Sequence, residues 1–565
     1  MRIRLVLLVF GVFALLNVHA QSLQDGIALL HGEKLKEAGE IFKNLAADGT
    51  NADNQYYLGY FYTKNNQFDE AKKAFDKGLE IDSKSYINKV GLGTLELQKG
   101  NKAAAKELFD EAEKKKKKDA EVLFRIGEAY TLFEKNNDPA EAIRLLDEAI
   151  KRDNTLADAY LAKGDALMLK NEGGPAATAY EYALGVKPNY AVAHNRIGQI
   201  YLRGKNYNLA LENYKKAIDS DPNFAPAYKD LAELYFLGKQ YKRAAENYDL
   251  YLEKSATTDP EMQLRATKFT FVADDYDRTI KLLDGLKGKS ADPMIDRMYG
   301  WSYLKINEPE KSIDYINKFI AEAPDKVIGD DYKYMGQAYN LTNTDGKGYD
   351  SLGMQYILKG ADMDTSATDA AATYKEVAAL YYGAKDYEKA APVFKKGIQL
   401  DTLKASPNDL FSLGLSYFQW STSLVAAGSP DSAAIAQKKK SLYLSADSSF
   451  AAVAVKTPDW PYAYYWRASS LYNAYDRQEN VDKGISAPYY EKLAELAEKD
   501  EDPSKYNSYL KFAYQYLGIY YQSTMNNPDK AKVIWEKLLK IDPDNANAKE
   551  GLGLNQPQAE ASANK

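Results

Sequence analysis

The stretch AVAHNRIGQIYLRGKNYNLALENYKKAIDSDPNFAPAYKDLAELYFLGKQYKRAAENYDLY, residues 191–251, decides the fold of this chain. It contains one pattern twice, in which a helix with a small residue at its centre, Gly198 or Ala232, precedes a second helix. In each second helix an alanine is followed four residues later by a tyrosine, namely Ala210/Tyr214 and Ala244/Tyr248. A spacing of four residues places both side chains on one helix face, and small residues let two helices approach closely. The pattern therefore predicts closely packed helix pairs.

The small-residue pairs recur along the chain at nearly constant intervals. Successive steps between them are 34, 34, 37, 34 and 34 residues. Such a period is typical of two-helix repeats that stack, because a single pair cannot bury its apolar stripe alone. We therefore predict an all-α superhelical solenoid of about fourteen helix pairs. The pairs are Leu58-Gly59, Leu92-Gly93, Ile126-Gly127, Lys163-Gly164, Ile197-Gly198 and Leu231-Ala232.

This pattern resembles the tetratricopeptide repeat, whose signature is matched best by Ala191–Pro222 and Ala225–Tyr251. Matches extend back to Asp25-Gly26 and forward to Leu552-Gly553, so the resemblance covers nearly the whole chain after its first residues. The last third, with Tyr465-Trp466-Arg467, is similar to an exported Bacteroidetes family of tetratricopeptide-repeat proteins of undefined function. Some members of that family accompany TonB-type outer-membrane transport machinery, so the resemblance implies such machinery as a partner.

The N-terminus resembles a secretory signal. Arg2 and Arg4 precede an apolar run, Leu5–Leu16, which ends at the small-residue exit Val18-His19-Ala20. This run is shorter than the roughly 20 apolar residues that span a membrane, so we expect cleavage before Gln21 rather than an anchor. The chain is therefore expected to be exported and periplasmic, with secretion or attachment to the cell surface as alternatives. We expect no direct membrane insertion after cleavage.

Departures from the repeat period predict where the array is interrupted. The repeat near Ala266-Thr267 is weak and is followed by Gly285–Pro293, which favours a bend. Extra residues after Leu413-Gly414, with a turn at Gly428–Asp431, predict an inserted helical hairpin. The end of the chain is polar and turn-rich, which favours disorder. The predicted segments are a signal (1–20), an N-terminal array (21–257), a bend (258–293), a C-terminal array (294–554) with the hairpin (421–441), and a disordered tail (555–565).

The composition argues against common kinds of chemistry. The chain has no cysteine and, after signal removal, only His31 and His194, which are far apart in sequence. We therefore predict no catalytic site, no metal site and no cofactor. The formal net charge of −6 gives no attraction for nucleic acid, which needs a concentrated basic surface.

In the tetratricopeptide family the first helix of each pair lines a concave groove, so the resemblance implies that partners bind there. The inward positions carry mixed charge in the N-terminal two-thirds and aromatic rings in the last third, and rings anchor interfaces well. An equally open alternative is that these rings pack against the inserted hairpin. The family's carboxylate clamp fits no register, because Asp230 stands where the clamp has a neutral donor. The predicted partner-binding residues are Asn195, Arg203, Lys229, Trp301, Phe411, Phe418, Tyr462, Tyr465 and Tyr472.

These observations favour a non-enzymatic scaffold that binds partner proteins or peptides in its concave groove. One alternative is a structural component of an outer-membrane transport or secretion machine. Another is a glycan-binding protein or enzyme subunit that uses the aromatic C-terminal third.

Overall fold

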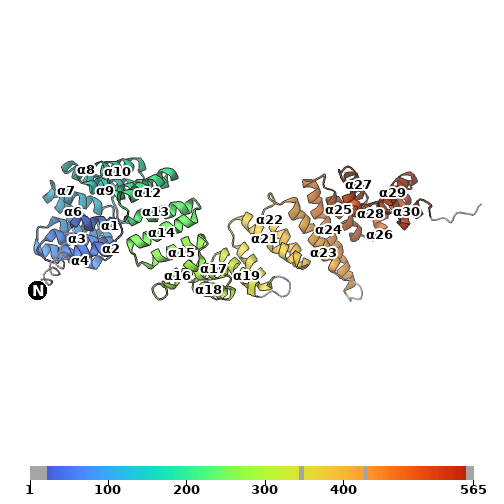
Figure 1. Cartoon of the computed structure of the whole chain (residues 1–565), viewed down its shortest axis with the longest axis horizontal. Helices are drawn as coiled ribbons and strands as arrows, with labels where there is room; N and C mark the ends of the chain where they lie inside the picture. Colours follow the sequence, from blue (N-terminus) through green and yellow to red (C-terminus); the bar gives the residue numbers. More distant parts are fainter. Residues whose placement is uncertain (1–21, 343–348, 426–430, 555–565) are drawn as a thin grey trace, which may run out of the picture. The chain divides into compact units, whose positions relative to one another are not determined.

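The computed structural model describes residues 22–342, 349–425 and 431–554. These residues form 30 α-helices joined by turns and short 3-10 or π segments, and the described residues include no strand. Neighbouring helices pack as pairs along the chain, with α25 packed on α27 and α28 on α29 near the end (Figure 1). The predicted all-α solenoid of helix pairs is confirmed. The predicted signal and C-terminal tail lie outside the described residues.

The chain divides into two compact units between Met298 and Tyr299, within α17 (Met294–Lys305). The helices before this division are α1 (Leu23–His31), α2 (Leu35–Ala46), α3 (Ala52–Lys64), α4 (Phe68–Ile81), α5 (Tyr86–Gln98), α6 (Lys102–Lys116), α7 (Ala120–Ala129), α8 (Pro139–Arg152), α9 (Ala157–Leu169), α10 (Gly173–Val186), α11 (Ala191–Arg203), α12 (Tyr207–Ser220), α13 (Ala225–Leu237), α14 (Tyr241–Ser255), α15 (Pro260–Val272) and α16 (Tyr276–Asp284).

The helices of the second unit follow the same order. They are α18 (Pro309–Glu322), α19 (Gly329–Thr342), α20 (Ser351–Asp362), α21 (Ala367–Gly383), α22 (Tyr387–Leu400), α23 (Pro407–Ser423), α24 (Ser432–Lys456), α25 (Pro461–Ala474), α26 (Arg477–Asp482), α27 (Ala487–Glu498), α28 (Asn507–Ile519), α29 (Pro528–Ile541) and α30 (Ala546–Gly551). The segment 258–293, where the sequence predicts a bend, contains the helix pair α15 and α16. The bend itself stays a prediction.

A close contact between a glycine and a ring joins the two helices of a pair. Gly198 on α11 lies against Tyr214 on α12, and a Cβ atom added to this glycine would lie 2.5 Å from the tyrosine ring. Gly59 meets Phe75 in the same way, and Gly518 meets Trp535. The Tyr214 side chain is fully buried. The helix register expected from the sequence is thus confirmed at these positions.

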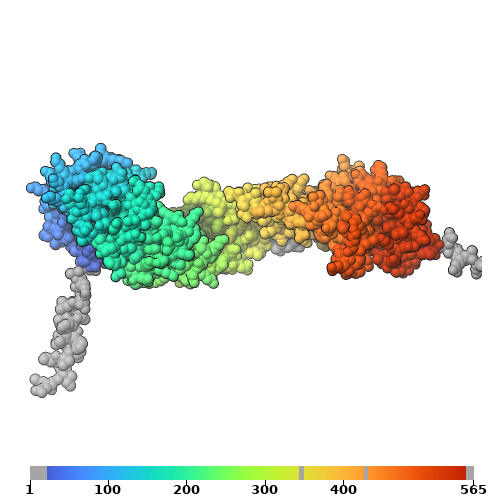
Figure 2. Space-filling view, turned by 90° about the horizontal axis from the view of Figure 1, so that it is seen from above, coloured from blue at the N-terminus to red at the C-terminus, as the bar shows by residue number. Residues whose placement is uncertain are grey.

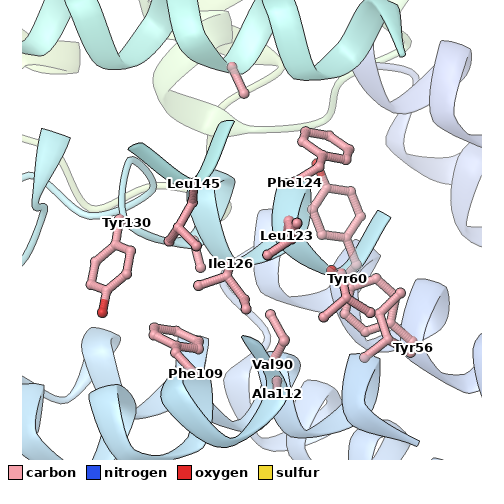
Figure 3. Close-up of a cluster of buried hydrophobic side chains, with 14 of the residues drawn as sticks. Tyr56, Tyr60, Val90, Phe109, Ala112, Leu123, Phe124, Ile126, Tyr130 and Leu145 are labelled. Atoms are coloured by element: carbon pink, nitrogen blue, oxygen red, sulfur yellow. The ribbon is translucent and has the colours of Figure 1, made fainter. Parts of the chain in front are cut away.

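The core of the first unit runs along the array between first and second helices. Figure 3 shows Phe109 of α6 facing Ile126 of α7 and Tyr130 directly after α7. The Phe109 and Tyr130 rings meet edge to face, with centroids 5.1 Å apart. Consecutive pairs are in close contact within each unit (Figure 2). Each pair therefore buries its apolar stripe against its neighbours, as stacking repeats require.

The long helices α23 and α24 enter the segment where the sequence predicts an inserted hairpin. Helix α24 has 25 residues, whereas the second helix of the preceding pair, α22, has 14. The buried Ser421 hydroxyl donates a hydrogen bond to the carbonyl oxygen of Lys439 at 3.0 Å, which ties the two helices together. Residues 426–430, where the predicted turn falls, lie outside the described residues.

Replacing Gly198 by leucine tests the contact between paired helices. We expect Gly198→Leu to lower the free energy of unfolding by about 1–3 kcal/mol, because the added side chain overpacks against Tyr214. The matched control is Gly185→Leu, since a Cβ atom at Gly185 meets nothing within 4 Å. Thermal melting should show a lower midpoint for the first variant alone. Equal midpoints for both variants would contradict the assigned contact.

Candidate functional site

A cavity of about 770 Å³ lies within the first unit, and we call it the inner cavity. The first helices of six pairs, α1, α3, α7, α9, α11 and α13, supply most of its lining, whereas α5 supplies none of it. It is therefore the concave side of the array rather than a gap between paired helices. Acidic and basic side chains line it in equal number. They are Glu33, Lys64, Arg125, Glu128, Asp158, Asp165, Arg196, Arg203, Lys229 and Asp230.

Glu33, in the turn after α1, joins the beginning of the first unit to helices far along the chain. Its Oε1 forms an ion pair with Lys229 Nζ at 2.6 Å, and its Oε2 accepts a hydrogen bond from the Tyr251 hydroxyl at 2.9 Å. These partners are 196 and 218 residues away in sequence. The concave surface therefore turns back on itself, and α1 lies near α13 (Figure 1).

Arg125 forms a rigid charged wall of the inner cavity. Its side chain is 3% exposed and pairs with Glu121 at 2.8 Å and Glu128 at 2.9 Å. The hydroxyls of Tyr57 and Tyr60 donate to these two carboxylates at 2.9 and 2.6 Å. Burial by itself raises the pKa of Glu128, but Arg125 and the hydrogen bond from Tyr60 hold that pKa below its ordinary value. Glu128 is thus an ionised and fully compensated carboxylate.

Two carboxylates of α9 also have partners within the wall. Asp165 pairs with Arg196 at 3.0 Å and accepts a hydrogen bond from the Tyr180 hydroxyl at 2.7 Å. Asp158 accepts a hydrogen bond from the Tyr190 hydroxyl but forms no ion pair with a described residue. His31 lies beside them, where burial lowers its pKa and Asp158 opposes that effect.

Asp230, on α13, is held by neutral groups. The side-chain amides of Asn195 and Gln199, on α11, both donate to its Oδ2, at 2.8 and 2.7 Å. Asp230 forms no ion pair within the described part of the chain. Burial raises the pKa of Asp230, and the two amide hydrogen bonds and Lys229 oppose this effect. The carboxylate therefore lacks a directly bonded cation.

Three of the predicted partner-binding residues line this one cavity. Asn195 is buried beside Asp230, and Lys229 is held by Glu33. Arg203 is exposed and has no carboxylate partner among the described residues. Trp301 belongs to the second unit, where it stacks on Tyr334 with centroids 4.7 Å apart and donates to Asp331 at 3.1 Å. Of the four predicted residues that precede the aromatic last third, three, namely Asn195, Arg203 and Lys229, therefore line the same cavity.

The predicted aromatic residues are all half-buried and contact other rings. Phe418 packs on Tyr443 of the long helix α24, with ring centroids 5.2 Å apart. For Phe418 this contact fits the alternative that the rings pack against the inserted hairpin, because α24 contains the second part of that hairpin. Partner docking at these rings stays a prediction. Other ring contacts include those of Phe411 with Phe450 and Trp460, Phe418 with Trp466, Tyr462 and Tyr465 with Tyr509, Tyr465 with Phe512, and Tyr472 with Tyr516.

Sequence reasoning missed the roles of Glu33 and Asp230. Asp230 was used only as an argument against a carboxylate clamp. An acidic residue at an inward position of a first helix could itself have marked Asp230 as a candidate binding residue. Glu33 carries no such signal, because it lies in a turn outside the helical pattern. Among the described residues, no group of three or more His, Asp or Glu side chains could hold a metal ion. No described helix is both long and apolar enough to cross a membrane.

Comparison with known proteins finds similarity to the tetratricopeptide repeat in part of the chain. Models of the tetratricopeptide repeat match residues 52–85, 131–191 and 191–224. Anaphase-promoting complex subunit 3 of Schizosaccharomyces pombe is 25% identical over 156 residues, which are 28% of this chain and 23% of that protein. The chain thus matches less than a quarter of the length of this relative.

Two similar solved structures are also tetratricopeptide-repeat proteins. The C-terminal part of one from Cytophaga hutchinsonii is 24% identical, with 51% of this chain and 99% of that chain covered and a TM-score of 0.31. One from Parabacteroides merdae is 16% identical, with 45% and 98% covered and a TM-score of 0.30.

The Asp230→Asn variant tests the cost of the buried carboxylate. Because the pKa of Asp230 is raised in the folded state, ionising this group costs folding free energy once the pH rises above its ordinary value of 3.8. We therefore expect Asp230→Asn to be more stable than the parent at neutral pH. This gain should vanish as the pH falls below 3.8, where Asp230 is protonated in both states. Denaturant unfolding at a series of pH values measures the difference, and a constant or opposite difference would contradict the argument.

Proposed function

Because models of the tetratricopeptide repeat match three stretches of the chain, we propose that it is a non-enzymatic interaction scaffold that binds an extended segment of a partner protein in the inner cavity. The observation that carries this proposal is the cavity itself, in which helices from separate repeats present polar groups to one space. Its volume of about 770 Å³ lies in the range of ordinary ligand pockets. A peptide segment fits such a space, whereas a folded domain does not.

The polar groups of the inner cavity suit a peptide. Asp230 is an acceptor without a bonded cation, and Arg203 is a donor without a bonded carboxylate in the described part of the chain. Most of the other charges neutralise one another inside the wall, as Arg125 does with Glu128. The wall is therefore rigid, and a small number of groups remain to hold a ligand. Such preorganised sites bind with a smaller loss of conformational freedom.

We further propose that the scaffold works in the periplasm, with secretion or attachment to the cell surface as alternatives. The signal-like residues 1–20 support export. A TonB-type transport machine is the proposed partner assembly, on the similarity of the last third to an exported Bacteroidetes family. The aromatic cluster of the second unit is the alternative docking site, since Phe512 is 62% exposed next to Tyr465.

Charge reversal at Arg203 tests the docking site. We expect Arg203→Glu to reduce the amount of partner captured from native cell envelopes, because this guanidinium is the unpaired donor of the inner cavity. A photo-crosslinking residue at position 203 should also attach to that partner, and one at position 215 should not. The control is Lys215→Glu, which makes the same charge change at an exposed position of α12.

Docking at the aromatic cluster of the second unit would give the opposite result in the capture experiment. If Phe512→Ser abolishes capture while Arg203→Glu leaves it unchanged, the partner docks on the second unit instead. Phe512 suits this comparison, because its exposed ring can be removed with little loss of packing.

A further inference from the structure

We propose that Asp230, together with Asn195, holds an alkylammonium group of the bound peptide, either a lysine side chain or a free N-terminus. This inference rests on the proposed peptide-binding function and names the chemistry that the inner cavity selects. It follows from the acceptors that remain once the internal pairs of the cavity wall are taken into account.

Most of the charged side chains that line the inner cavity form ion pairs with one another. Lys64 and Arg125 pair with Glu128, Arg196 pairs with Asp165, and Lys229 pairs with Glu33. In the described part of the chain, this leaves Asp158 and Asp230 without a paired cation and Arg203 without a paired anion. Unpaired carboxylates therefore outnumber unpaired cations in the cavity, which favours a basic ligand group.

The neighbouring lysine does not fill the Asp230 site. Lys229 is adjacent in sequence, but its Nζ lies 2.6 Å from Glu33 Oε1 and also sits 5.0 Å from the centroid of the Tyr251 ring. Glu33 thereby draws this ammonium away from Asp230. The first helix pair thus keeps the carboxylate open for a group from outside the chain.

Two oxygen atoms at this site, Oδ1 of Asp230 and Oδ1 of Asn195, accept no hydrogen bond from a described residue. Both donated hydrogen bonds reach Oδ2, and no hydrogen bond from a described residue reaches Oδ1. Asn195 is 2% exposed, and its own Oδ1 has no hydrogen-bond partner among the described residues. Because its Nδ2 must face the carboxylate to donate, that Oδ1 stays an acceptor on the same amide.

An alkylammonium matches this arrangement. It carries three N–H donors and one positive charge, so it can bond to Asp230 and to a neighbouring amide oxygen at once. A carboxylate ligand would instead meet a second carboxylate and unsatisfied acceptors. Burial raises the pKa of Asp230, and a bound cation would lower that pKa again, so binding and ionisation favour each other.

Titration of the full chain with short peptides tests the inference, with binding followed by ligand-observed NMR. Acetylated and amidated peptides that differ at one central residue carry lysine, Nε-acetyllysine or glutamate. A fourth peptide lacks lysine and has a free N-terminus. We expect the lysine peptide to bind about tenfold or more tightly than the acetyllysine peptide. Asp230→Asn should remove this preference, whereas Asp219→Asn, which removes an exposed carboxylate from α12, should keep it.

The outcomes separate the two proposals. A stronger response to the free N-terminus than to lysine supports the ammonium site and identifies its source as a chain end. If all the peptides bind equally and Asp230→Asn changes nothing, the ammonium site is wrong, and peptide binding itself stands if Arg203→Glu weakens it. Preferred binding of the glutamate peptide also overturns the inference. If no peptide binds, the proposed peptide-binding function fails together with it.

Discussion

The close contact between a small residue of the first helix and a large side chain of the second helix, in many pairs an aromatic ring, is the constraint on which the rest of the structure depends. Gly198 and Tyr214 show it most clearly, because a single added carbon would overlap the ring. The short distance between paired helices sets the thickness of each repeat, and each pair then stacks on the next. The curvature that results places α1 beside α13 and creates the inner cavity. The inner cavity thus arises from a packing rule that involves none of the charged residues lining it.

The inner cavity contains both charged side chains that pair with one another and charged side chains that have no ion-pair partner among the described residues. Arg125 and Glu128 are buried and compensate each other, and removing one partner of such a pair leaves an uncompensated buried charge. Asp230 differs, because its hydrogen-bond donors are neutral amides and burial raises its pKa. A residue that costs stability while neighbouring sites are compensated is where function is expected. This contrast distinguishes Asp230 from Glu128 and Asp165, which have bonded cations.

The sequence was sufficient to predict the helix pairs, because the 34-residue period and the small residues act locally. The resemblance to the tetratricopeptide family implied that Asn195, Arg203 and Lys229 lie at inward positions, and all three line the inner cavity. The closure by Glu33 could not be predicted, since its partners lie 196 and 218 residues away and no period links a turn to them. Nor could the sequence show which charges neutralise one another, since that depends on curvature accumulated over many repeats.

The contacts of Glu33 with Lys229 and Tyr251 affect the charge in the inner cavity more than they affect the stability of the fold. Glu33 and Lys229 have side chains 37% and 28% exposed, and an ion pair of this kind contributes about 1 kcal/mol or less. The backbone φ of Glu33, 57°, is not peculiar to this turn, because Lys205 and Lys239 adopt φ values of 58° and 56° in the matching turns of later repeats. The pair can therefore open at a small cost in free energy. While it is closed, Lys229 is bonded to Glu33 rather than to Asp230. The acidic turn after α1 thus leaves Asp230 without a directly bonded cation in the described part of the chain.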